Sequence, residues 1–186
     1  MKKNLIIILC ITLVQTSKAQ EKIISDTKVN VKLNRKLIKS RKKIEGKLND
    51  SENNALRKQL SKELSFDIPD DKNILINYDQ KGNNCMTYSY TPQEFKTMMS
   101  EEISISNLVT KNNNTIDFFV YNEDSFFINF FKENNRYILD SDFFKKNIFT
   151  LSENCEGFFI LKTNGEFMKY YGEDYYSDVS RYIENR

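Results

Sequence analysis

Residues 158–172 read FFILKTNGEFMKYYG and carry the strongest structural signal in the chain. The first four residues form an apolar run that is typical of a strand buried on both faces. The dipeptide Asn164-Gly165 favours a hairpin, because asparagine and glycine tolerate the positive φ angles that tight turns require. The stretch therefore predicts an antiparallel hairpin with strands near 158–163 and 166–171.

Two further strands are predicted upstream of this hairpin, at 74–79 and 115–121, from short apolar runs bounded by turn residues. A helix starts between them at Thr91-Pro92-Gln93-Glu94, where threonine can cap, proline fits the first turn and glutamate closes a capping box. Shorter helices are predicted at 126–133 and 141–148, and a last helix at 174–185. Helical crossovers make successive strands parallel, whereas a hairpin makes them antiparallel. The order predicts an α/β fold with one mixed sheet flanked by helices.

The first 19 residues have the pattern of an export signal. A short basic start precedes an apolar run of about ten residues, too short for a bilayer core that needs about 20. The small residues Ser17 and Ala19 suit cleavage before Gln20. We therefore expect residues 1–19 to be a signal peptide and the mature chain to be periplasmic or secreted, where disulfides persist.

The segment after this leader is basic, and the rest of the chain is acidic. Residues 20–65 carry 13 basic and 6 acidic side chains, whereas residues 66–186 carry 12 and 20. The basic segment can therefore dock on the acidic part or be simply solvated. Two apolar stripes at helical spacing predict a basic helical hairpin: Leu33, Leu37, Ile44 and Leu48, then Leu56, Leu60 and Leu64. We expect these stripes to be buried. The alternative is that residues 29–65 bind a protein partner or an anionic membrane surface. Nucleic acid is not expected as a partner, because export removes it.

The sequence contains no histidine. Its absence excludes Ser-His-Asp and Cys-His catalysis within this chain and the usual imidazole metal sites. The mature chain has two cysteines, Cys85 and Cys155, which are too few for a four-cysteine zinc site, and we expect no cofactor. Three carboxylate pairs, Glu101-Glu102, Glu123-Asp124 and Glu173-Asp174, are interpreted as helix-end or loop charges, because adjacent residues point apart on a helix or strand.

The element order from residue 74, with Cys85 after the first strand and before a capped helix, resembles the thioredoxin-like fold. Residues 158–172 are similar to the hairpin of exported thioredoxin-like proteins related to TlpA, where a strand, a polar-Gly turn, a second strand and a glycine precede the last helix. The resemblance covers about 110 residues. Together with the leader pattern and the basic segment, it divides the chain into a signal peptide at 1–19, a basic helical arm at 20–70 and a thioredoxin-like domain at 71–186.

The family's active-site residues are mostly missing from this sequence. The resemblance places Cys85 as the first cysteine of a pair at a helix start, where the helix dipole lowers a thiol pKa. Tyr88 stands in place of the second cysteine, and Asn84 replaces the tryptophan before the first. The family also has a cis-proline before the strand that matches 158–161, and here the matching loop contains Asn154 and Cys155 instead.

The resemblance implies that Cys85 and Cys155 are neighbours, because the cysteine loop and the cis-proline loop of this fold face each other. The pair can be a buried permanent disulfide, worth roughly 4 kcal/mol by loop entropy. It can also be an exchanging pair with Cys85 as nucleophile, or two thiols that are free or bonded to another chain. We expect the permanent bond and hence an exported, non-catalytic binding or envelope-accessory module. The alternatives are a thiol–disulfide oxidoreductase with Cys85 and Cys155 as catalytic residues, and a partner- or membrane-binding protein that uses the basic helices.

Overall fold

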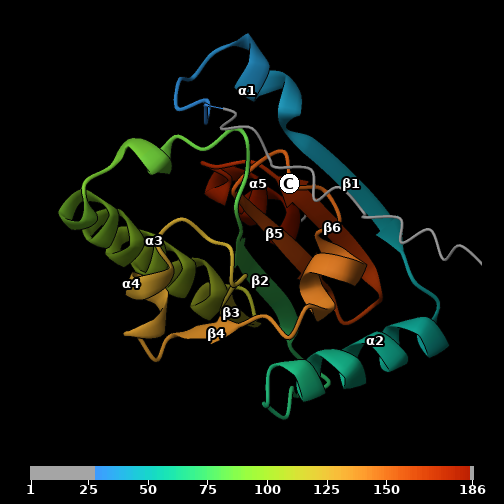
Figure 1. Cartoon of the computed structure of the whole chain (residues 1–186). Coiled ribbons are helices and arrows are strands. Elements are labelled where there is room, and N and C mark those ends of the chain that lie inside the picture. The colour runs from blue at the N-terminus through green and yellow to red at the C-terminus, as the bar shows by residue number, and fades with distance from the viewer. Residues whose placement is uncertain (1–27, 185–186) are drawn as a thin grey trace, which may run out of the picture.

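The computed structural model describes residues 28–184, so the expected signal peptide at 1–19 and the start of the basic arm lie outside the described residues. A six-stranded mixed sheet forms the centre, with helices on both faces (Figure 1). Its strand order is β1-β6-β5-β2-β3-β4. The strands are β1 (Lys42–Lys47), β2 (Asn73–Asp79), β3 (Thr115–Tyr121), β4 (Tyr137–Leu139), β5 (Glu156–Leu161) and β6 (Glu166–Tyr171). The helices are α1 (Arg35–Ser40), α2 (Asp50–Glu63), α3 (Pro92–Asn112), α4 (Ile128–Lys132) and α5 (Tyr176–Ile183), with a 3₁₀ turn (Thr87–Ser89) and a π-helical turn (Phe144–Ile148).

The four strands predicted from the sequence are confirmed as β2, β3, β5 and β6, with small shifts at their ends. β2 and β3 are parallel and are joined through α3, whereas β5 pairs antiparallel with both β2 and β6. The predicted start of α3 is also confirmed. The Thr91 hydroxyl accepts the Glu94 N–H, and the Glu94 carboxylate accepts the Thr91 N–H at 2.8 Å. The α/β class with a mixed sheet flanked by helices is therefore confirmed.

The turn of the β5–β6 hairpin depends on Gly165. Its φ is +82°, a left-handed conformation that glycine adopts without steric cost. Its N–H donates to the Lys162 carbonyl, and the Lys162 N–H donates to the Glu166 carbonyl, so three residues form the loop. A Cβ atom at Gly165 would lie 2.6 Å from the carbonyl oxygen of Leu48. The turn thus also positions the chain that leads into α2.

Two helical layers bury the sheet (Figure 1). α2 and the π-helical turn cover one face, where Leu60 and Phe144 pack with Ile76 of β2 and other strand residues. α3 and α5 cover the other face, where Val179 packs with Leu75, while Phe95 and Met99 pack with Phe119. Successive residues of β2 therefore enter different cores, which explains why the strand is apolar along its whole length.

The helix predicted across residues 33–48 is wrong for residues 42–47, which form strand β1 instead. β1 pairs antiparallel with β6 and lies at the edge of the sheet (Figure 1). Gly46 stands opposite Phe167, and a Cβ at Gly46 would lie 2.6 Å from the Phe167 ring, so the missing side chain makes room for that ring. Lysine-rich strands are common at sheet edges, because charge discourages pairing with another chain. This tertiary pairing overrides the helical spacing of the local sequence.

The outcome for the two apolar stripes is mixed. In the first stripe Leu37 is buried, whereas Leu33 and Ile44 are 66% and 41% exposed, so the expectation of a continuous buried stripe is wrong. The second stripe is confirmed, because Leu60 and Leu64 of the α2 region lie in the core. Asn49 caps α2, and its side chain accepts the N–H of Glu52. None of the described helices is long and apolar enough to cross a membrane.

Candidate functional site

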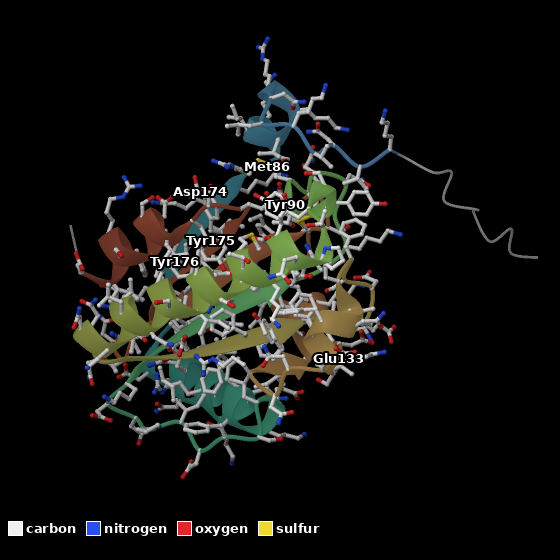
Figure 2. The ribbon with its side chains drawn as sticks, turned by 90° about the vertical axis from the view of Figure 1, so that its left-hand side faces the viewer. Met86, Tyr90, Glu133, Asp174, Tyr175 and Tyr176 are labelled. Atoms are coloured by element: carbon white, nitrogen blue, oxygen red, sulfur yellow. A yellow bond between two sulfur atoms is a disulfide. The ribbon has the colours of Figure 1, made fainter. Side chains whose placement is uncertain are left out.

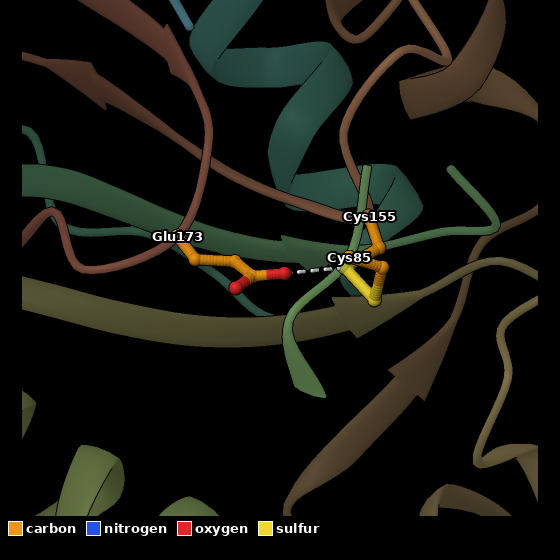
Figure 3. Close-up of side chains that lie close together, drawn as sticks. All are labelled: Cys85, Cys155 and Glu173. Carbon is orange, nitrogen blue, oxygen red and sulfur yellow. Dashed lines mark hydrogen bonds between the residues drawn. A yellow bond between two sulfur atoms is a disulfide. The ribbon is translucent and has the colours of Figure 1, made fainter. Parts of the chain in front are cut away.

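A disulfide joins Cys85 to Cys155, two residues separated by 70 positions in the sequence (Figure 3). Their Cα atoms lie 5.3 Å apart, within the range that a disulfide can bridge. Cys85 belongs to the loop that follows β2, and Cys155 directly precedes β5. The expected proximity of the two cysteines is therefore confirmed. Each cysteine is only 1% exposed.

Backbone contacts hold the two cysteine loops together independently of the sulfur atoms. The Asn84 N–H donates to the Glu153 carbonyl at 2.9 Å, and the Cys155 N–H donates to the Asn84 carbonyl at 3.3 Å. Gly82 permits this approach, because a Cβ there would lie 2.3 Å from the carbonyl carbon of Asn154. The role of Gly82 is therefore to let the two loops meet.

Two polar side chains contact the sulfur atoms. The Thr87 hydroxyl lies 3.2 Å from Cys85 Sγ and 3.7 Å from Cys155 Sγ. Glu173 Oε1 lies 3.0 Å from Cys155 Sγ (Figure 3) and accepts the Met86 N–H at 2.7 Å. Burial raises the pKa of Glu173 from 4.5 to about 7, although the N–H groups of Met86 and Thr87 oppose the rise. Since a bonded sulfur carries no proton, only the protonated Glu173 carboxyl can donate a hydrogen bond to it.

Cys85, Cys155 and Glu173 also form a potential metal-ligand cluster. One potential ligand atom from each of these three side chains lies within 4.8 Å of the other two. Within residues 28–184, no other group of three Cys, Asp or Glu side chains meets this distance. Cysteine binds metal ions as a thiolate, and both thiols are consumed by the disulfide. The bonded state is therefore not a metal centre.

Further carboxyl groups are buried near Glu173. Burial raises the pKa of Glu102 from 4.5 to about 7, even though the Tyr175 hydroxyl, 2.9 Å from Glu102 Oε1, opposes the rise. Burial also raises the pKa of Glu156 well above its ordinary value, and the charges of Glu173, Glu102 and Asp79 add to this rise. Asp79 has a raised pKa for the same primary reason, desolvation. Four acidic groups therefore favour their neutral forms around one site.

A cleft of about 350 Å³ opens above these acids, between α3 and the start of α5. Figure 2 shows Met86, Tyr90, Asp174, Tyr175 and Tyr176 gathered around this region, with Glu133 on another part of the surface. The acidic lining residues are Glu101, Glu102, Glu156, Glu173 and Asp174, and the apolar or aromatic ones are Met86, Tyr90, Met98, Ile105, Tyr175 and Tyr176. Thr87 lines the cleft as well, so the disulfide lies directly behind its wall.

The site residues expected from the sequence form only part of this arrangement. The two cysteines are brought together, whereas Tyr88, at the position of a second active-site cysteine, is 49% exposed and packs its ring on Phe126 at 4.4 Å. From the sequence, Glu102 and Glu173 are interpreted as helix-end or loop charges. Glu173 does lie in the loop before α5, whereas Glu102 lies in the middle of α3. Both side chains are more buried than that interpretation suggests, because Glu173 is 5% exposed and Glu102 is partly buried. Glu173 stands between Gly172, the residue after β6, and Asp174, and this local sequence carries no signal that marks it as buried.

Comparison with known proteins supplies no relative for this chain: no family model, curated protein or solved structure matches it. The interpretation of the site therefore depends on its own geometry.

Proposed function

We propose that the chain is an exported thioredoxin-like module that binds a ligand without catalysing a reaction, and that the Cys85–Cys155 bond stabilises its binding cleft. The main support is the burial of the bond, since both cysteines are 1% exposed. Thiol–disulfide exchange requires a thiolate to reach a sulfur atom, and access is one of the factors that set its rate. A bond that solvent does not reach is suited to holding two loops in place.

The thioredoxin-like assignment is supported by the order of the elements. A parallel pair, β2 and β3, is joined through α3, and an antiparallel hairpin, β5 and β6, is added to the same sheet before the last helix. The two cysteine loops also meet, as the resemblance implies. Export is supported by the leader pattern at 1–19 and is compatible with a disulfide, because oxidising compartments preserve such bonds.

A binding role is supported by the form of the cleft. Its volume of about 350 Å³ falls within the range of small-molecule sites, and its lining combines apolar side chains with a few convergent polar groups. The disulfide connects the loop before the 3₁₀ turn to the start of β5, and Met86, Thr87 and Glu156 beside it all line the cleft. Fixing these loops would preorganise the cleft and reduce the entropy lost when a ligand binds.

Thiol–disulfide exchange is the second candidate, and one contact favours it. Glu173 Oε1 lies 3.0 Å from Cys155 Sγ, and burial raises the pKa of this carboxyl to about 7. If an external dithiol opened the bond by attacking Cys85, the Cys155 thiolate would leave and could take a proton from Glu173. The burial of both sulfur atoms opposes this role, because the attacking thiolate has no open path.

These two functions differ in the reactivity of the bond. We expect the native protein to show negligible insulin-disulfide reduction with dithiothreitol, and both cysteines to resist alkylation by iodoacetamide until a denaturant is added with the reductant. Mass spectrometry of the alkylated protein checks this expectation. Rapid alkylation of Cys85 near pH 6 after mild reduction, with loss of the signal in Cys85→Ser, would instead support the oxidoreductase.

A further inference from the structure

We propose that the cleft between α3 and α5 binds an organic cation, a primary ammonium group carried on an apolar aromatic body. This inference rests on the proposed binding function, because it names the ligand class for the same cleft. It is argued from the charge of the lining, from two unpartnered buried oxygen atoms and from the apolar walls.

The charge of the lining favours a cation. Five carboxyl groups line the cleft, and none of the described residues that line it is basic. Arg41 carries an opposing charge, which interacts with Glu173 from outside the lining. Carboxylates gathered in a low-dielectric cleft repel one another and attract a positive ligand.

Two buried oxygen atoms in the cleft have no hydrogen-bond partner. Glu173 Oε2 and Glu156 Oε1 are both without one, and the Glu173 residue is 5% exposed. Buried polar atoms are nearly always hydrogen-bonded, and leaving one unsatisfied is costly. An ammonium group offers three N–H donors and can satisfy carboxylate oxygens on two side chains at once.

The spacing of the carboxyl groups favours an organic cation over a metal ion. Within residues 28–184 the one set of three potential ligands within 4.8 Å of one another is the disulfide pair with Glu173, so no three carboxylates there are close enough to share an ion. A larger cation can reach carboxylates that lie further apart.

The walls of the cleft define the rest of the ligand. Met86, Met98 and Ile105 provide apolar surface, and Tyr90, Tyr175 and Tyr176 provide aromatic rings. Aromatic rings attract cations at their faces and also pack on other rings. Ile105 and Tyr90 are 45% and 39% exposed, so the apolar part of a ligand would cover surface that is now in contact with water.

Binding should depend on pH because the ligand favours the ionised carboxylates. The groups that face the cleft are Glu101 and Glu102 of α3, Glu156 of β5, Glu173 and Asp174 before α5, and the phenols of Tyr90, Tyr175 and Tyr176; Asp79 lies behind them and Arg41 beside Glu173. Burial raises the pKa of both Glu102 and Glu173 to about 7. An ammonium ion stabilises their charged forms, so it should bind more tightly as the pH rises through 7 and release protons as it binds.

Calorimetric titration of the disulfide-bonded protein with phenethylamine tests the proposal, with phenethyl alcohol as the neutral probe of similar shape. We expect the amine to bind near pH 8, to bind about tenfold more weakly near pH 6, and to be strongly preferred to the alcohol. Glu173→Gln and Glu102→Gln should each weaken amine binding about ten- to hundredfold, because each removes a charged acceptor. Glu133→Gln is the matched control, since Glu133 is exposed outside the cleft.

The proposal is overturned if phenethylamine fails to bind, if the alcohol binds equally well, or if Glu133→Gln weakens binding as much as the cleft variants. Circular dichroism of each variant shows whether it is folded, and the two cleft variants provide independent chances to obtain a folded protein. Alkylation of the same samples separates this inference from the proposed function. If the disulfide resists reduction but the amine does not bind, only the proposal of an ammonium ligand is rejected. If the disulfide is readily reduced, the proposal of a non-catalytic module is rejected.

Discussion

Replacing Cys85 and Cys155 together by alanine is expected to lower the free energy of unfolding by about 4 kcal/mol. The bond joins residues separated by 70 positions and restricts the conformations of the unfolded chain. Removing it raises the conformational entropy of the unfolded chain, which favours unfolding. It also removes two buried sulfur atoms from a packed site. Urea denaturation followed by circular dichroism measures the difference, provided that both proteins unfold in a single transition.

The reduced wild-type protein is the control for this double substitution. It retains the sulfur atoms but lacks the bond, so its stability should be close to that of the variant. A loss below about 1 kcal/mol in both samples would show that the bond contributes little to the fold. The backbone contacts of Asn84 with Glu153 and Cys155 would then be sufficient to join the loops.

The second large effect is a fall in stability between about pH 4.5 and pH 7, the reverse of ordinary acid denaturation. Burial raises the pKa of both Glu102 and Glu173 from 4.5 to about 7. Between these values the folded protein retains protons that the unfolded chain has released. The resulting stability is fully present below about pH 4.5 and is lost as the pH rises through about 7. Each group should contribute on the order of 1–3 kcal/mol.

Two exposed groups act in the opposite direction at lower pH. Hydrogen bonds from Thr91 lower the pKa of Glu94, and Lys146 lowers the pKa of Asp142. Stability from these groups is present above their ordinary pKa values and is lost as the pH falls through the lowered values. The loss of stability from Glu94 and Asp142 therefore occurs at a lower pH than the titration of Glu102 and Glu173.

Urea denaturation of the wild type, Glu173→Gln, Glu102→Gln and the control Glu133→Gln, at several pH values from about 5 to 8, measures this dependence. Glutamine stays neutral, so each cleft variant should lose part of the slope and be more stable than the wild type near pH 8. The control should keep the wild-type slope. A wild-type protein that becomes more stable between pH 5 and pH 7 would show that these carboxyls are not buried as described.

The sequence predicted the central sheet well because its signals are local. Asn164-Gly165 lies at a turn where Gly165 needs a positive φ, and Thr91 and Glu94 form their capping box within one helical turn. Residues 42–47 were assigned wrongly because Ile44 fits a helical stripe, whereas the strand forms by pairing with β6. That partner lies more than a hundred positions away and leaves no local pattern.

The site was predicted only in part, since burial is a tertiary property. The proximity of Cys85 and Cys155 followed from the resemblance, but nothing in their neighbourhood indicated the carboxyls. The rule that adjacent side chains point apart does hold here: Glu101 and Asp174 are exposed, while Glu102 and Glu173 point inward. All four of these residues line the cleft, but only one member of each of the two pairs is buried or partly buried, and the sequence does not say which member it is.

The reduction potential of the Cys85–Cys155 bond tests the non-catalytic module most directly. Equilibration of the protein with dithiothreitol buffers, followed by alkylation and mass spectrometry, gives this potential from the ratio of reduced to oxidised protein. We expect a value below about −300 mV, typical of structural disulfides in secreted proteins. A value between about −270 and −120 mV, where the dithiol oxidoreductases lie, would contradict the proposed function.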